Sequence, residues 1–384
     1  MACNSHTDYD VIVVGSGPAG GMCSYELSQK GLSVLIIEKE KLPRYKVCAG
    51  GLTKKAVDII PEDFQGIIEN HTYNVRTTHN CKWEFSKTTP FPIVAMVMRD
   101  KFDYFLVQKS LEKGARLLDG TKVNSVEELS DYVVVKTEGG NFKSRVIVGA
   151  DGVTSHVARR LGLRKHRKLG VAIEGELHPD KEVDVSRYGG SLHLDFHVIP
   201  KGYGWIFPKK AHLSVGVFTT LPRIKNLKKY FFEYTRKKGL AGSYNCQSLV
   251  GHQIPIGGGV GNEIFNTKRG LVVGDAAGLA DPITGEGIYF ALRSGKIAAD
   301  VVSKSLTSDI LELNEYSKLI NDEIVSDFKY GIYFAAFLYN LGFIAYNLTR
   351  KVELVSEGFI KVVIGEYSYR SILTKIPEKL HKLF

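Results

Sequence analysis

Cysteine is scarce and scattered in this sequence. There are 5 cysteines among 384 residues, and none of them stands in a Cys-x-x-Cys pair. Small disulfide-stapled folds and structural zinc sites both need closely spaced cysteines, so the sequence excludes these two classes. No metal site is predicted, and the pattern favours the reducing environment of the cytoplasm.

Targeting and repeat signals are also missing. The start, MACNSHTDYDVIVVG, has no basic cluster and no cleavage pattern, so no secretory signal is expected. Internal repeats and low-complexity segments are absent. The longest apolar stretch, 328–348, contains one charged residue, Lys329. Its length suits a membrane span of about 20 residues, but Tyr, Asn and Gly interrupt it. A buried or membrane-facing helix is therefore favoured over a span.

Acidic residues are outnumbered by basic ones, 41 to 51, which gives a formal net charge of +10. Such a surface suits nucleic acid, an anionic membrane or an acidic substrate. Zinc-finger spacings and RNA-binding signatures are lacking, so nucleic acid is not an expected partner. An anionic membrane surface remains a candidate partner, which would place a cytoplasmic protein at the membrane periphery.

A nucleotide-binding pattern begins the chain. The segment YDVIVVGSGPAGGMCSYELSQKGLSVLIIEKE reads as a strand, a glycine turn, a helix and a second strand. Gly15, Gly17 and Gly20 have the spacing that allows a tight turn, close approach to a pyrophosphate, and close packing of helix on strand. Glu38 ends the second strand and can accept hydrogen bonds from a ribose. The acid favours an unphosphorylated ribose, as in FAD or NAD.

Two later strands end at an aspartate beside a glycine. Asp151 follows the strand RVIVGA, and Asp275 follows GLVVG. Each aspartate can bind a ribityl hydroxyl of a flavin, although each can equally cap the helix that comes next. The helix after Asp275 is predicted to start near Gly287. The backbone N–H groups of Gly287 and Ile288 can then face a flavin ring.

Together these three stretches resemble the fingerprints of the p-hydroxybenzoate hydroxylase-type flavoprotein superfamily. MRDKFDYFL resembles its arginine at a helix start, which implies that Arg99 contacts the flavin or its phosphates. The resemblance implies FAD as the cofactor. No second fingerprint is identified, because GGGVGNE at Gly257 is read as having no strand before it. A separate NAD domain is not expected, so the electron donor, NADPH or a ferredoxin-type protein, is expected to dock transiently.

Two further stretches distinguish members of this superfamily. PRYKVCAGGL and PKGYGWIFPKK resemble the geranylgeranyl reductase family, which has a Cys-Gly-type turn near the flavin and a Y-x-W-x-F-P motif. In a strand, Tyr203, Trp205 and Phe207 share one face while Gly202 and Gly204 take the other. The aromatic face is predicted to line the substrate pocket, with a plain hydrophobic core as the alternative. Its rings favour the cationic character that develops on an alkene during reduction.

The resemblance implies an FAD-dependent reductase that saturates C=C bonds of geranylgeranyl chains, using hydride from the reduced flavin and a proton. The turn Cys-Ala-Gly-Gly departs from the Cys-Gly-acid form of some archaeal lipid reductases. The head group of the isoprenoid substrate, a diphosphate, lipid, quinone or pigment, therefore stays open. Lys201, Lys209 and Lys210 either hold a diphosphate at the pocket mouth or form a solvated face.

The turn that starts at Cys48 is predicted to cross the flavin ring. Cys48 is either a small polarizable group packed on the flavin or a proton source on the substrate side. Cys48, Tyr203 and Trp205 are therefore the candidate catalytic residues. The complete set of predicted flavin contacts is Gly15, Gly17, Ala19, Gly20, Glu38, Cys48, Ala49, Gly50, Gly51, Arg99, Val123, Asp151, Asp275, Gly287 and Ile288.

The predicted fold class is α/β, with a Rossmann-like FAD-binding domain, an interleaved and mostly antiparallel β substrate domain, and a helical C-terminal part. The expected segments are 1–60, 95–164 and 265–310 for FAD binding, 61–94 and 165–264 for substrate, and 311–384 for the helical part. Two rival functions remain. A flavin monooxygenase or halogenase shares the fold, but halogenases usually show W-x-W-x-I-P at this motif. A non-catalytic prenyl-binding escort protein would not need complete flavin fingerprints.

Overall fold

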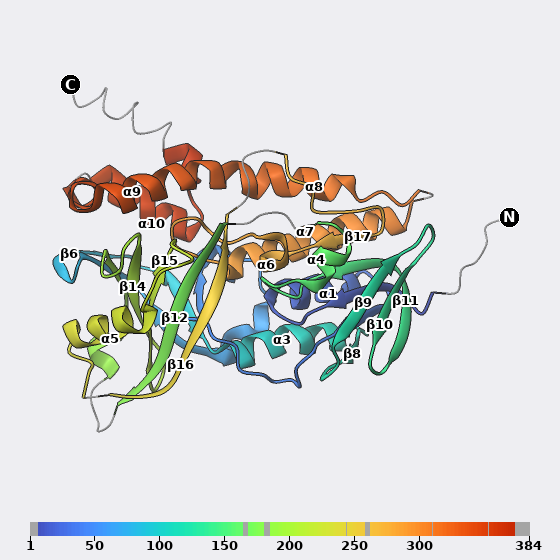
Figure 1. Ribbon diagram of the computed structural model, residues 1–384, viewed down its shortest axis with the longest axis horizontal. Helices are drawn as coiled ribbons and strands as arrows, with labels where there is room; N and C mark the ends of the chain where they lie inside the picture. Colours follow the sequence, from blue (N-terminus) through green and yellow to red (C-terminus); the bar gives the residue numbers. More distant parts are fainter. Residues whose placement is uncertain are drawn as a thin grey trace.

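The computed structural model describes residues 7–163, 168–179, 185–242, 244–257, 262–308, 310–351 and 353–372. The first residues of the chain, on which part of the expectation about a secretory signal rests, lie outside these ranges. The structure contains two large sheets, a small sheet between them, and helices that cover their faces (Figure 1).

The first sheet has seven strands and forms the nucleotide-binding half. Its order is β8-β2-β1-β11-β10-β9, with β17 beside β11. The five parallel strands are β1 (Tyr9–Val14), β2 (Val34–Ile37), β8 (Arg116–Leu118), β11 (Gly140–Gly149) and β17 (Gly270–Val272). Two antiparallel strands, β9 (Val123–Glu128) and β10 (Val133–Thr137), extend one edge. The central strands are buried apolar runs, as parallel strands between helical layers usually are.

Helices pack on this sheet and on one another. The main ones are α1 (Pro18–Gln29), α3 (Arg99–Glu112) and α7 (Ile288–Leu306), and α1 contacts both α3 and α7. Shorter helices follow strand ends or turns: α2 (Lys54–Val57), α4 (His156–Arg160), α6 (Gly274–Ala277) and the 3-10 segments Glu62–Ile67 and Val185–Tyr188. The helix predicted to start near Gly287 is α7, so that prediction is confirmed.

The second sheet is the larger antiparallel layer. Its strands are, in order, β16 (Tyr244–Ile256), β12 (Lys168–Pro179), β15 (Leu213–Thr219), β14 (Gly202–Pro208), β13 (Ser191–Phe196), β5 (Asn74–His79) and β6 (Lys82–Thr88). Only the β13–β5 pair is parallel among these described neighbours. Helix α5 (Leu227–Lys237) covers one face of the sheet and leaves the other facing the nucleotide-binding half.

A three-stranded sheet connects the two halves. It consists of β3 (Gly51–Thr53), β7 (Val94–Val97) and β4 (Ile68–Thr72), in the order β3-β7-β4. Strand β3 continues directly from the Cys48 turn, and β7 continues into Arg99 at the start of α3. The small sheet therefore fixes the position of this turn relative to α3.

The C-terminal part is helical. It contains α8 (Asn314–Ile320), a π-helical turn (Asn321–Val325), α9 (Ser326–Lys351) and α10 (Glu353–Ile364). The apolar stretch 328–348 lies within α9, which runs along the second sheet in Figure 1. Tyr339 donates a hydrogen bond to Ile283 O at 2.6 Å, and Tyr346 donates to Thr77 O at 2.8 Å. Among the described residues, no helix combines the length and apolarity that crossing a membrane requires.

The predicted α/β fold class with a helical C-terminal part is confirmed. The prediction that no strand precedes the GGGVGNE segment was wrong, because strand β16 ends at Ile256, immediately before it. Alternating polar residues and Pro255 disguise this edge strand in the sequence. The segment still differs from a nucleotide fingerprint: β16 is antiparallel to its neighbour, and residues 262–269 contain no helix. Part of the segment, 258–261, lies outside the described residues.

Candidate flavin and substrate site

A cavity of about 1360 Å³ lies between the first sheet and the apolar face of the second sheet. Of the predicted flavin contacts, all except Gly20 line it, and so do Tyr203, Trp205 and Phe207. The structure thus brings residues from the start, middle and three-quarter point of the chain to one space.

Gly20 acts on the cavity through packing. A Cβ at Gly20 would lie 1.9 Å from Gly15 O, so the helix rests directly on the turn that precedes it. Gly15 has φ +101°, a conformation that favours glycine. Around Gly17 the nearest atoms to an added Cβ would be the guanidinium groups of Arg99 and Arg44, at 3.9 and 4.0 Å. The turn therefore offers open space between backbone N–H groups and positive charge.

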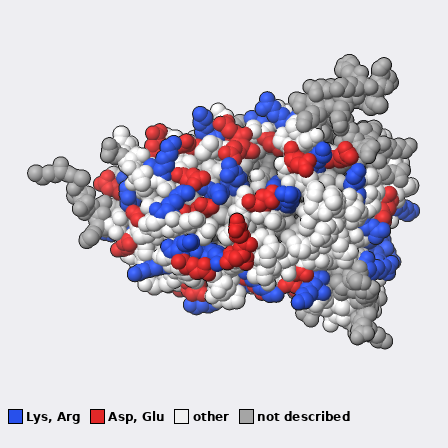
Figure 2. All heavy atoms as spheres, turned by 180° about the vertical axis from the view of Figure 1, so that it is seen from behind, with Lys and Arg blue, Asp and Glu red and all other residues white. Residues whose placement is uncertain are grey.

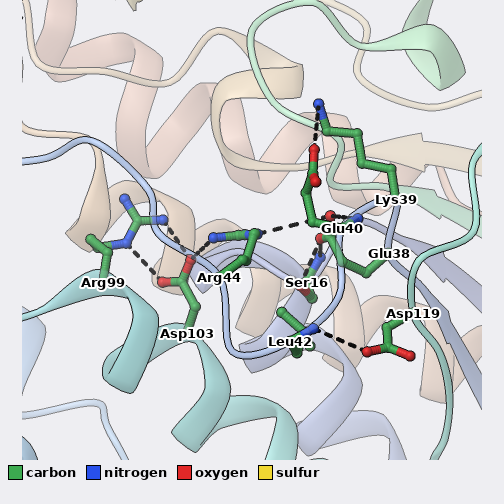
Figure 3. Close-up of polar contacts among 9 residues, drawn as sticks. All are labelled: Ser16, Glu38, Lys39, Glu40, Leu42, Arg44, Arg99, Asp103 and Asp119. Carbon is green, nitrogen blue, oxygen red and sulfur yellow. Dashed lines mark hydrogen bonds and ion pairs between the residues drawn. The ribbon is translucent and has the colours of Figure 1, made fainter. Parts of the chain in front are cut away.

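Glu38 is buried where β2 ends (Figure 3). Its Oε2 accepts hydrogen bonds from Ser16 N at 2.9 Å and Ser16 Oγ at 2.6 Å, and its Oε1 accepts one from Glu40 N at 3.1 Å. A carboxylate has about four acceptor positions. These protein contacts hold the side chain in place and leave acceptor capacity toward the cavity, as binding a ribose requires.

Arg99 belongs to an ion-pair cluster that the sequence analysis did not include (Figure 3). Its Nε and Nη2 donate to the two oxygens of Asp103 at 2.7 and 2.8 Å, and Arg44 Nη1 donates to Asp103 at 3.0 Å. Burial opposes the charged form, but Asp103 and Cys48 together raise the pKa of Arg99 above its ordinary range. The i,i+4 spacing of Arg99 and Asp103 in one helix was the available signal.

The two aspartates beside glycine have different surroundings. Asp151 accepts hydrogen bonds from His156 N at 2.6 Å and Val157 N at 3.1 Å, so its carboxylate caps α4 while the residue lines the cavity. Asp275 lies at the start of α6, and a Cβ at Gly287 would be 3.5 Å from its Oδ1. The second aspartate and the start of α7 therefore border the same part of the cavity.

The Cys48 turn is held by two side chains. Cys48 Sγ accepts a hydrogen bond from Gly50 N at 3.4 Å, and the Arg99 side chain also hydrogen-bonds Cys48. Lys209 Nζ donates to Ala49 O at 2.6 Å and to Val97 O at 2.9 Å. Gly50 has φ +63°, and a Cβ there would lie 2.1 Å from Val97 O. The turn is therefore packed without room for a larger residue.

Lys209 corrects the sequence-based view of the three lysines. It is 2% exposed, so it is not part of a solvated face, and its ammonium group donates to Ala49 O in the Cys48 turn and to Val97 O in β7. Lys201 and Lys210 are exposed, and neither lines the cavity. The burial of Lys209 was not predicted because a charged residue just past a strand end is usually solvated.

The aromatic residues of β14 form one wall of the cavity. Tyr203, Trp205 and Phe207 all line it, and Tyr203 and Trp205 are at most 9% exposed. On the opposite side of β14, a Cβ at Gly204 would lie 2.7 Å from the ring of Tyr234 in α5. The glycine face thus admits a close helix, and the aromatic face is directed at the space between the two sheets.

Comparisons with known proteins agree with this geometry. A family model described as FAD binding domain matches residues 8–201. The chain is 34% identical to an uncharacterized protein of Methanosarcina barkeri, over 88% of this chain and 86% of that one. It is 30% identical to digeranylgeranylglycerophospholipid reductase of Methanocaldococcus jannaschii, over 81% of this chain and 79% of the relative. The chain belongs to the geranylgeranyl reductase family of FAD-dependent oxidoreductases.

Solved structures show the same fold. A geranylgeranyl bacteriochlorophyll reductase-like protein of Thermoplasma acidophilum superposes with a TM-score of 0.80 at 24% identity, covering 96% of this chain and 98% of that chain. The flavin-dependent brominase Bmp2 superposes with a TM-score of 0.71 at 21% identity, covering 97% and 99%. At these identities the likenesses establish the fold and do not distinguish between reductase and halogenase chemistry.

FAD is the cofactor of this family member, and the described residues fit it. The glycine turn and α1 offer N–H groups to a diphosphate, and Arg44, Lys46 and Arg99 add positive charge at the cavity. Glu38 supplies the acceptor for a ribose. Burial, together with the neighbouring Arg99, lowers the pKa of Lys46, which is consistent with crowded positive charge where an anionic group would bind.

Replacing Glu38 by Gln is expected to weaken FAD binding by about tenfold or more. The amide keeps the size of the side chain but loses a charged acceptor, a change that costs about 1.5–3 kcal/mol for a hydrogen bond to an ionised group. Titration of the flavin-free protein with FAD, followed by flavin fluorescence, measures the change. Glu112→Gln is the matched control, because the Glu112 side chain is 56% exposed and lies outside the cavity lining. Equal affinities in both variants would contradict the ribose role of Glu38.

Proposed function

We propose that this enzyme saturates C=C bonds in geranylgeranyl chains. The observation that carries the proposal is the aromatic wall of β14, which faces the flavin-binding half across a single cavity. A long apolar chain gains about 25 cal/mol per Å² of surface that it buries there. The same rings favour positive charge on an alkene carbon by roughly 0.5–2 kcal/mol per contact.

The residues of the chain have separate tasks in this reaction. Bound FAD, when reduced, supplies a hydride. Tyr203, Trp205 and Phe207 hold the alkene and exclude water, and the Cys48 turn, fixed by Lys209, forms the adjoining side of the cavity. A proton must reach the second alkene carbon from a side chain or water. The names of family relatives support an isoprenoid lipid as the substrate, and NADPH or a ferredoxin-type protein is the proposed electron donor.

Incubation of dithionite-reduced enzyme with geranylgeranyl diphosphate and with prenylated lipids tests this proposal. The expected products have gained two hydrogens for each reduced double bond, as seen by mass spectrometry. Products that instead contain oxygen or halogen, formed only with molecular oxygen, would favour the monooxygenase or halogenase alternative. A colourless protein that binds prenyl chains without reducing them would favour the escort alternative.

We also propose that α9 rests on an anionic membrane surface. Its exposed apolar residues include Tyr333 at 70% and Ile344 at 69%, and Trp83 on β6 contacts Phe343 with ring centroids 4.7 Å apart. Figure 2 shows a broad area without charged side chains on this half of the molecule. Apolar side chains on a helix face together with net positive charge favour binding to anionic lipid.

Binding to anionic liposomes is expected at low salt and should weaken as salt is added, because a net charge of +10 contributes to the attraction. Ile344→Glu should reduce the bound fraction in a sedimentation assay. Ile310→Glu is the control, since Ile310 is 77% exposed but lies between α7 and α8, outside α9. Equal losses in both variants, or no binding by the wild type, would contradict a membrane role for α9.

A further inference from the structure

One carboxyl group lies on the aromatic face of the second sheet. Glu174 on β12 pairs with Gly216 on β15, and Gly216 pairs with Trp205 on β14. Residues that are directly opposite on neighbouring strands share a face of the sheet. A Cβ at Gly216 would lie 2.1 Å from the Trp205 indole, so the indole extends over Gly216 toward Glu174.

A short hydrogen-bond chain links the carboxyl to the aromatic wall. Trp205 Nε1 donates to Ser214 Oγ at 3.3 Å, and Ser214 Oγ donates to Glu174 Oε1 at 3.0 Å. In the part of the chain that the structure describes, Ser214 is the one hydrogen-bond partner of this carboxyl, and no ion pair reaches it. Glu174 lines the cavity together with Trp205 and is 4% exposed.

The surroundings favour the neutral acid. Burial raises the pKa of Glu174 well above its ordinary value, beyond the opposing effects of the Ser214 hydrogen bond and the Lys209 charge. Lys209 does not form an ion pair with it, because its ammonium group donates to the carbonyls of Ala49 and Val97. The groups that act on Glu174 are Ser214 from β15, Lys209 after β14, Glu176 from β12 and Arg99 from α3.

A second ionisable side chain on this face is less suited to give a proton. His252 on β16 pairs with Ala172 on β12 and lines the same cavity. Burial, with the charges of Lys46 and Arg99, lowers the pKa of His252 to about 4. Its imidazole is therefore neutral at neutral pH and is a weak acid, whereas a buried carboxylic acid can release its proton once charge develops beside it.

We propose that Glu174 donates the proton that the alkene receives during reduction. This inference rests on the proposed function. The O–H bond of Glu174 breaks as a C–H bond forms at one alkene carbon, and the hydride from reduced FAD forms the second C–H bond at the other. Glu174 becomes a carboxylate and regains its proton from water. The alkene is reduced, the flavin is oxidised, and Cys48 is left as the packed group that shapes the turn.

The test compares Glu174→Gln with the wild type in single-turnover reduction of geranylgeranyl diphosphate. The variant should be slower by about a hundredfold or more, the range for loss of a general acid, with unchanged FAD content and unchanged affinity for the saturated product. Glu174→Asp should recover part of the rate. Glu233→Gln is the matched control, because Glu233 lies on α5, outside the cavity lining and apart from the groups that act on Glu174, and this variant should react at the wild-type rate.

A second measurement does not depend on turnover. The infrared spectrum of the flavin-free protein should contain a C=O band from a protonated buried carboxyl that is absent in Glu174→Gln and fades as pH rises. The wild-type reduction rate should fall over the same pH range, since the acid must hold its proton, and this decline should be missing in the variant. A wild-type rate in Glu174→Gln would overturn the proton-donor role alone. Failure of the wild type to reduce any prenyl substrate would overturn the proposed function.

Discussion

A protein carrying Gly20→Ala is expected to purify without flavin. The added methyl group would lie 1.9 Å from Gly15 O, and real Cβ atoms do not approach a carbonyl oxygen so closely. The Gly15 carbonyl is a backbone group and the new Cβ is fixed by the backbone of α1. The clash can therefore be relieved only if α1 moves away from the turn. The N–H groups at the start of the helix would then no longer point toward the diphosphate. Forced overpacking of this kind also costs about 1–3 kcal/mol of stability.

Gly66→Ala is the matched control for this substitution. A Cβ at Gly66 meets no atom within 4 Å, so the same chemical change there should leave flavin content and thermal stability near those of the wild type. Visible absorbance of the purified proteins gives the flavin occupancy directly, and circular dichroism shows whether each variant is folded. A folded Gly20→Ala protein with full flavin would contradict the assignment of this turn to the cofactor.

Replacement of Trp205 should give the second largest effect. Trp205→Ala removes a side chain that is 5% exposed, which costs about 3–5 kcal/mol of stability for a buried aromatic residue. It also removes the ring that fills the space over Gly216 and the N–H that bonds Ser214. If the indole favours cationic charge on the alkene, turnover should fall by a further 2- to 30-fold, which corresponds to roughly 0.5–2 kcal/mol.

Two variants separate packing from chemistry at this position. Trp205→Phe keeps an aromatic face but has no N–H for Ser214, so it should retain most stability and FAD while turnover falls. Trp83→Ala changes the second tryptophan of the chain, which is 47% exposed and lies outside the cavity. With reduced flavin and in detergent, the Trp83→Ala enzyme should reduce isoprenoids at the wild-type rate. An unchanged rate and product pattern in Trp205→Phe and Trp205→Ala would show that Trp205 has a purely structural role.

The flavin half of the site was predictable because its signals are local. Strand, glycine turn, helix and Glu38 follow one another within a short segment, and each has a physical requirement for its residue type. The alternation of Tyr203, Trp205 and Phe207 could also be read from strand periodicity alone. Such patterns need no knowledge of how distant segments pair.

The remainder of the site depends on the pairing of distant strands. Glu174 and Trp205 are 31 positions apart and meet only through the register of β15 between them. Lys209 resembles any solvated lysine until the Cys48 turn is placed against it. Arg44 reaches Asp103 across 59 positions, which no local pattern reveals. Buried charges with remote partners are thus the group of functional candidates that sequence reasoning missed.

The residues of the flavin site come from distant parts of the chain, and this affects how the enzyme is synthesised. Glu38 is synthesised early, but Gly287 and Ile288, which border the same cavity, emerge from the ribosome about 250 residues later. At 5–20 residues per second this interval lasts roughly 10–50 s. A nascent chain therefore carries the glycine turn long before the site can close. Prematurely terminated chains should be colourless, so the flavin absorbance per purified chain should report the fraction of finished molecules.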